Sequence, residues 1–125
     1  MHPRLNAGTF VFSTLAPNQE IGLGEVVALV REPEGVSVVV DERDASRLRL
    51  TPVMRCAWIT LTVNSDLRAV GLTAAFASAL ANAGISCNVV AGTNHDHIFV
   101  PVEQADAAMD ELRALQQRYV QVGEQ

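Results

Sequence analysis

The stretch 55–91 constrains the fold most, because it predicts a strand, a helix and a second strand joined by very short connections. Over 55–63, aliphatic residues alternate with threonine, which is typical of a strand with one buried face. Three residues that are all competent helix caps follow directly: Asn64, Ser65 and Asp66. We therefore expect a helix over 67–83 that ends at Gly84, and then a strand over 85–91.

The rest of the second half continues this pattern. A strand is expected over 97–102, followed by a helix over 103–118 whose apolar residues recur at spacings of three and four. Residues 119–122 could add a short edge strand. The helix over 67–83 is rich in small residues, and its predicted packing stripe is Leu67, Val70, Gly71, Ala74, Ala75, Ser78, Leu80 and Ala81.

The first half predicts the same order of elements without one helix. Its strands are expected over 9–15, 25–31 and 36–40, and a short helix over 41–50 begins at Asp41 as candidate N-cap. Only the stretch 16–22 stands where the second half has its first helix.

The chain is therefore predicted to be an α+β protein made of two tandem βαββαβ halves. Each half is ferredoxin-like, with an antiparallel sheet and its helices on one face, and the first half has a degraded first helix. We place the halves at 1–52 and 53–125 and expect them to pack as one compact unit, because each alone is small for an independent core.

Composition excludes several functions. The net charge is −5 and all nine basic residues are arginines, which argues against a phosphate-binding or Schiff-base lysine and against nonspecific nucleic-acid binding. No apolar run is long enough to span a membrane. The two cysteines lack a zinc-type spacing and the N-terminus lacks a secretory pattern, so we expect reduced thiols, a cytoplasmic protein and no cofactor.

Several stretches of this sequence together resemble the ACT domain. The first is Val63 to Leu72, followed by Gly84-Ile85-Ser86-Cys87-Asn88-Val89-Val90. Further likeness lies in Gly8 to Phe12 and in His95 to Pro101. The chain is similar to small bacterial tandem ACT-domain proteins of the aspartate-kinase-like and CASTOR-like group. This resemblance implies a regulatory module that binds a small ligand, often an amino acid, at an interface between paired domains.

The resemblance also implies where the ligand binds. The implied ligand-binding residues are Asn64, Ser65, Asp66, Val70, Gly71, Ser86, Cys87 and Asn88. Residues 64–66 would lie at a helix N-terminus, where free backbone N–H groups attract a carboxylate, and Asp66 could hold a ligand amine. Plain helix capping by 64–66 and ordinary sheet pairing by 86–88 are the structural alternatives.

A second hypothesis uses the triplet His95-Asp96-His97. In an extended segment His95 and His97 point the same way, and both could bind Zn²⁺ or Ni²⁺ in a metal-responsive sensor. A polar hairpin connection is the structural alternative. Catalysis has little support, because a thiolate–imidazole pair of Cys87 with a histidine would lack an oxyanion motif, so we expect no enzyme activity.

Partners are expected to be a small molecule, an amino acid above all, and a second copy of the chain. Open sheet edges and a small-residue helix face both favour a homodimer. ACT domains usually regulate a fused enzyme or transcription regulator, and no such domain is visible here, so a signal would pass through an unidentified protein partner. A ligand-free interaction module is the third hypothesis.

Overall fold

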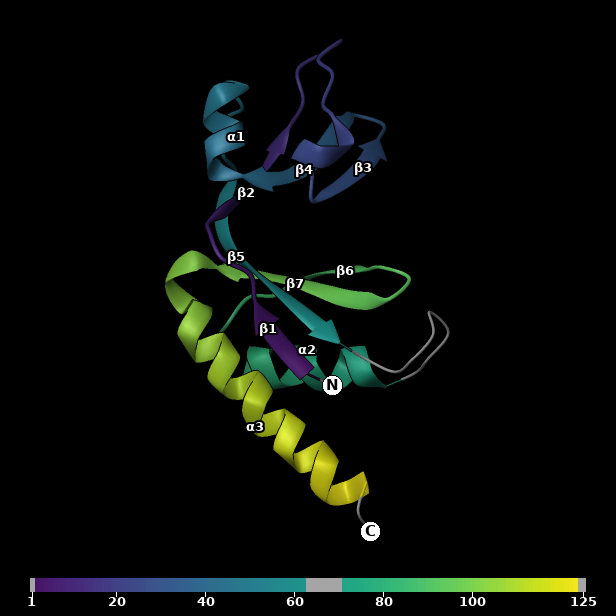
Figure 1. The fold of residues 1–125 in the computed structure, drawn as a ribbon, viewed down its shortest axis with the longest axis vertical. Coiled ribbons are helices and arrows are strands. Elements are labelled where there is room, and N and C mark those ends of the chain that lie inside the picture. Colours follow the sequence, from purple (N-terminus) through teal and green to yellow (C-terminus); the bar gives the residue numbers. More distant parts are fainter. Residues whose placement is uncertain (1, 63–70, 124–125) are drawn as a thin grey trace. The chain divides into compact units, whose positions relative to one another are not determined.

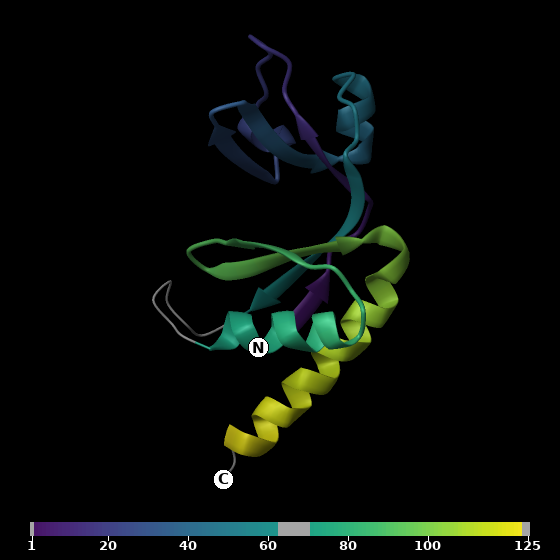
Figure 2. The same ribbon diagram turned by 180° about the vertical axis from the view of Figure 1, so that it is seen from behind.

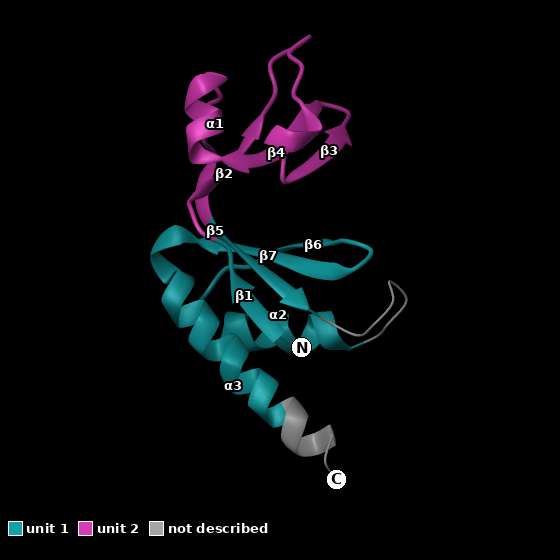
Figure 3. Cartoon of the chain, viewed as in Figure 1, with its two compact units in different colours: residues 1–6, 57–125 teal, residues 7–56 magenta. Residues whose placement is uncertain are grey.

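The computed structural model of the chain describes residues 2–62 and 71–123 (Figure 1). The chain divides into two compact units, which Figure 3 distinguishes by colour. Unit 1 comprises residues 1–6 and 57–125, and unit 2 comprises residues 7–56. The expected packing of the two halves as one compact unit stays a prediction.

Unit 2 is a four-stranded antiparallel sheet with one short helix, α1 (Glu42–Arg47). Its strands lie in the order β3-β4-β2-β5, and each pairs antiparallel with its neighbour. Their bounds are β2 (Phe10–Thr14), β3 (Ala28–Glu32), β4 (Gly35–Asp41) and the first residues of β5 (Met54–Thr62). Between β2 and β3 the chain forms only a 3-10 turn, η1 (Leu23–Glu25), so the predicted loss of the first helix is confirmed.

The core of unit 2 is aliphatic because alternate residues of β2 and β4 face α1. Val11, Val38 and Val40 are almost fully buried and contact Ala45 of α1 and Leu50, which follows the helix. The predicted cap is confirmed: the Asp41 carboxylate accepts a hydrogen bond from the N–H of Arg43.

Unit 1 contains the remainder of β5 and the last elements of the chain. They are α2 (Leu72–Asn82), β6 (Asn88–Ala91), β7 (His95–Pro101), η2 (Val102–Gln104) and α3 (Ala105–Gly123). A strand at the N-terminus, β1 (His2–Leu5), pairs antiparallel with β5, which gives the strand order β1-β5-β7-β6. Figure 2 shows α2 and α3 from behind, and both pack on one face of this sheet. Each unit is thus ferredoxin-like, as predicted.

The fourth strand of unit 1 was predicted from the wrong segment. Residues 119–122 do not form an edge strand, because α3 continues to Gly123. The edge of β5 is instead paired with β1, in a register that places Pro3 opposite Leu61. Four residues with a proline carry too short a pattern to predict a strand, and their partner lies more than fifty residues away in sequence.

The core of unit 1 lies between its sheet and its two helices. Fully buried residues come from β5, β7, α2 and α3: Ile59, Leu61, Phe76, Leu80, Ile98, Val100, Ala108 and Leu112. The predicted stripe of the first helix is wrong, since Ala74, Ser78 and Ala81 are exposed. The large side chains of Phe76 and Leu80 set the buried face, because burying them removes most apolar area from water.

Among the described residues, no helix is both long and apolar enough to span a lipid bilayer.

Candidate functional site

The implied ligand-binding residues fall into two segments of unit 1. Asn64, Ser65, Asp66 and Val70 lie outside the described residues. Gly71 comes directly before α2, and the segment Ser86–Asn88 follows that helix. Gly71 and Ser86 therefore lie at opposite ends of an eleven-residue helix, roughly 16 Å long at 1.5 Å per residue (Figure 1). One copy of unit 1 does not bring the two segments together.

Gly71 is the N-cap residue of α2, not an interior residue as expected. Its φ of 101° lies in the left-handed region that favours glycine, and a Cβ there would meet no atom within 4 Å. The glycine is therefore needed for its backbone conformation and not for close packing. No side chain of the described residues caps this helix end, and its first turn holds no acid, so its free N–H groups keep a partial positive charge.

The segment Ser86–Asn88 leads into β6, an edge strand of unit 1. The helix before it ends at Gly84, whose φ is 76°, and the N–H of Ile85 donates to the carbonyl oxygen of Leu80 at 2.9 Å. Ser86 and Asn88 are exposed, and Asn88 stands opposite Phe99 of β7. Within the described part of the chain β6 pairs with β7 alone, so one side of its backbone is open to a ligand or another strand.

Cys87 is half-buried against the core of unit 1. Burial raises the pKa of its thiol to about 11, so the thiolate needed by a nucleophile is scarce at neutral pH. The pKa of Cys56 is raised to about 11 for the same reason. Neither cysteine has the electropositive surroundings of a catalytic thiol.

A polar network that sequence reasoning missed lies on the other face of the unit 1 sheet. The indole Nε1–H of Trp58 donates to Nδ1 of His97 at 3.0 Å, and the Thr60 hydroxyl lies 3.4 Å from the same nitrogen. Asn6, just after β1, donates its side-chain N–H to the Thr60 hydroxyl at 2.9 Å. The available signal was the alternation along β5, which places Trp58 and Thr60 opposite the buried aliphatic residues.

This network bears on the metal hypothesis for His95 and His97. The Trp58 hydrogen bond makes Nδ1 of His97 an acceptor, so its ring proton resides on Nε2, where a metal would bind. Desolvation by burial, followed by the neighbouring His95, lowers the pKa of His97. Nδ1 of His95 is buried without a hydrogen-bond partner in the described structure. Among the described residues, no group of three or more His, Cys, Asp or Glu side chains could hold a metal ion.

The β6–β7 turn fits closely around these histidines. A Cβ on Gly92 would lie 3.1 Å from the His95 carbonyl oxygen and 3.3 Å from Nε2 of His97. The N–H of Gly92 also donates to that carbonyl oxygen at 2.9 Å, which closes the turn. This arrangement holds the His97 ring in place and is consistent with a structural role of the hairpin.

Comparisons with known proteins agree with the architecture. A family model for the ACT domain matches residues 53–114, and a second ACT-domain model matches residues 1–57. No curated protein matches significantly.

Solved structures give the same picture. A Vibrio cholerae protein of unknown function, described as a possible transport protein, is 46% identical with a TM-score of 0.78, covering 88% of this chain and 85% of that one. An Agrobacterium tumefaciens protein is 20% identical with a TM-score of 0.67, covering 90% and 87%. The aspartokinase alpha and beta subunit structure is 11% identical with a TM-score of 0.65, covering 94% and 98%. The last two likenesses concern the fold alone.

Proposed function

Because this chain belongs to the ACT-domain family, we propose that it is a non-catalytic regulatory module that binds an amino acid. ACT domains are regulatory modules and usually bind amino acids. The observation that carries the proposal is the pair of ACT-domain matches, which together extend over residues 1–114. The ligand-binding residues implied by resemblance are proposed to form its site.

The chemistry of the described part supports this assignment. The uncapped N-terminus of α2 offers backbone N–H groups to a carboxylate. The open edge of β6 offers N–H and C=O groups, and Ser86 and Asn88 are exposed beside it. Asp66 is proposed to hold the α-ammonium group by a charge-assisted hydrogen bond.

We propose that a second copy of the chain completes the site. ACT domains commonly dimerise, and the two ligand-binding segments lie at opposite ends of α2, so one copy alone supplies only part of the site. Both units have an edge strand with exposed apolar residues: Leu29 and Val30 on β3 are 44% and 53% exposed, and Val89 on β6 is 36% exposed. A homodimer would cover such edges, and regulation would then pass to another protein in the cytoplasm, where free thiols such as Cys56 and Cys87 persist.

The test is a thermal-shift screen of the full chain with each of the twenty amino acids, Zn²⁺ and Ni²⁺. A ligand that binds only the folded state stabilises it by about 2.7 kcal/mol at a concentration of 100 Kd. Particular amino acids should therefore raise the Tm while chemically distant ones do not. A flat response to all twenty would overturn the proposal, and a response to metal alone that is lost in His95→Ala/His97→Ala would favour the metal sensor.

A further inference from the structure

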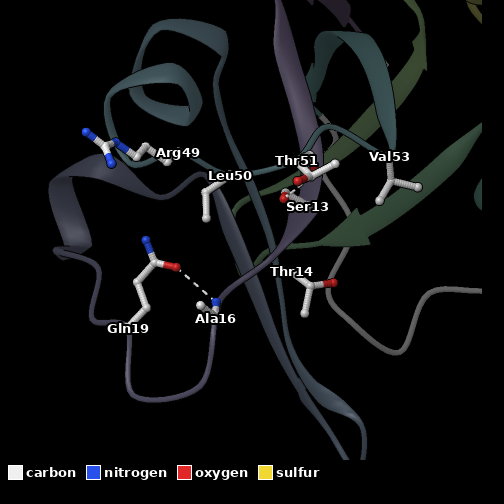
Figure 4. Close-up of a pocket in the computed structure, with 8 residues that line it drawn as sticks. All are labelled: Ser13, Thr14, Ala16, Gln19, Arg49, Leu50, Thr51 and Val53. Atoms are coloured by element: carbon white, nitrogen blue, oxygen red, sulfur yellow. Dashed lines mark hydrogen bonds between the residues drawn. The ribbon is translucent and has the colours of Figure 1, made fainter.

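A hollow of about 280 Å³ lies on unit 2, beside the segment that replaces the first helix (Figure 4). It is formed where the chain leaves β2 and where it returns after α1, and all of its lining residues belong to unit 2. Ala16, Leu50 and Val53 give it apolar walls, and Ser13, Thr14 and Thr51 contribute hydroxyl groups. In Figure 4, Arg49 and Gln19 lie at one end of the hollow and Thr51 and Val53 at the other.

Arg49 occupies a position that normally calls for glycine. The N–H groups of Leu50 and Arg49 donate to the carbonyl oxygens of Ala45 and Ser46 at 2.9 and 3.2 Å, which is the Schellman arrangement after α1. α2 ends in the same arrangement, and there the equivalent left-handed residue is Gly84. Arg49 has a φ of 59°, a conformation disfavoured for a residue with a Cβ.

Only two non-glycine residues of the described chain have positive φ, and both line hollows next to the missing helix. Arg49 lines the hollow of Figure 4, and Asn18, with a φ of 66°, lines a neighbouring one of about 590 Å³. Asparagine tolerates this conformation well, whereas arginine has no local reason to adopt it. A strained residue of this kind is a reason to look for a role of its side chain.

The charge of Arg49 is also unbalanced. The other arginines close to α1 each form an ion pair: Arg43 with Asp41, Arg47 with Glu25 and Asp44, and Arg55 with Glu42. Arg49 is exposed and forms no ion pair with any residue that the structure describes. None of the described residues lining the hollow is acidic, so its net charge is positive.

We propose that this hollow binds a small carboxylic acid, whose carboxylate pairs with the Arg49 guanidinium. A guanidinium offers parallel N–H donors that match the two oxygens of a carboxylate. The apolar walls accept a short aliphatic body, and the Thr14 and Thr51 hydroxyls suit a hydroxyl or keto group. Because no lining carboxylate can hold an ammonium group, the occupant is an acid without an α-amine. This site goes beyond the amino-acid site proposed above and lies in the other unit.

The test uses the ¹⁵N-labelled full chain and two-dimensional NMR. Sodium L-lactate, L-alanine and sodium chloride are titrated at equal ionic strength, since lactate and alanine differ in carrying a hydroxyl or an ammonium group. We expect saturable shifts of the amides of Gln19, Arg49 and Leu50 with lactate, and neither alanine nor chloride should reproduce them. Alanine binding at the proposed amino-acid site would instead shift amides of unit 1, so the two proposals fail separately.

Three variants decide the role of the arginine. Arg49→Gly should raise the lactate Kd at least tenfold while leaving the Tm equal or higher, because glycine relieves the left-handed strain. Arg49→Lys keeps the charge without the fork and should weaken binding less. Arg113→Gln, which removes an exposed charge from α3, is the control and should not change the Kd. Lactate shifts that do not saturate, that chloride or alanine matches, or that persist in Arg49→Gly would overturn the proposal.

Discussion

The indole of Trp58 donates a hydrogen bond to Nδ1 of His97 at 3.0 Å, which requires the imidazole to be neutral and to carry its proton on Nε2. Protonation would place an N–H of the imidazole against an N–H of the indole. This contact therefore links the chain's single tryptophan to the ionisation of a half-buried histidine.

We predict that unfolding free energy falls as the pH drops below about 6.5. Burial lowers the pKa of His97 in the folded state, so the unfolded chain binds the proton first. The stability from the neutral ring is present above the unfolded pKa and is lost as the pH falls through the folded one. Urea titrations between pH 5.5 and 7.5, followed by Trp58 fluorescence, measure the effect.

His97→Gln is the matched variant, because its side-chain oxygen can still accept the Trp58 hydrogen bond but does not titrate. It should flatten the pH dependence in this window, leaving only what His2 and His95 contribute. An unchanged slope would show that the Trp58–His97 contact is not the origin of the effect.

We predict that the N-terminal strand stabilises a unit far away in sequence. Deleting residues 2–5 removes the backbone hydrogen bonds between β1 and β5, and at about 1 kcal/mol for each bond it should cost about 2–4 kcal/mol. Thermal unfolding monitored at Trp58 reports on unit 1. Arg4→Thr keeps the backbone pairing and should melt like the parent chain; equal Tm values for the deletion and the parent would refute the pairing.

The buried face of α2 can be tested by one pair of substitutions. Phe76 is fully buried, so Phe76→Ala should destabilise unit 1 by about 3–5 kcal/mol. Ser78→Ala changes an exposed residue of the same helix and should stay within about 0.5 kcal/mol. Urea unfolding measures both, and the reverse order of effects would restore the face expected from the small-residue stripe.

Cys87 should react slowly with alkylating reagents. With its pKa raised to about 11 by burial, only about one thiol in 10⁴ is ionised at pH 7. Mass spectrometry after iodoacetamide treatment of the folded chain should show far slower labelling than in urea. Labelling as fast as that of a free thiol would reopen the possibility of a nucleophilic cysteine.

Much of the fold was predictable because local signals agreed with each other. Asp41 as a cap, Gly84 as a helix stop and the missing first helix were all predicted and confirmed. The likeness between the halves carried the architecture, since each repeats the same order of strands and helices. What failed was long-range: the pairing of Pro3 with Leu61 depends on which strand edge is free, and no local pattern encodes that.

The candidate site was less accessible to sequence reasoning. Spacing places His95 and His97 on one side of a strand, but it cannot show that Trp58 occupies a ring nitrogen of one of them. Arg49 looked like any other surface arginine, because neither its left-handed backbone nor its missing ion pair leaves a trace in the sequence. Whether Ser86, Cys87 and Asn88 bind a ligand stays a prediction.

The central claim, amino-acid binding by an ACT module, is tested most directly by titration calorimetry with the amino acid that gives the largest thermal shift. We predict saturable heat for the full chain. Asp66→Ala should weaken the affinity about 10- to 150-fold, since a charge-assisted hydrogen bond to the α-ammonium group contributes about 1.5–3 kcal/mol. Loss of a helix cap alone would instead cost about 1 kcal/mol of stability and leave the affinity unchanged. Heats equal to dilution for every amino acid would contradict the claim itself.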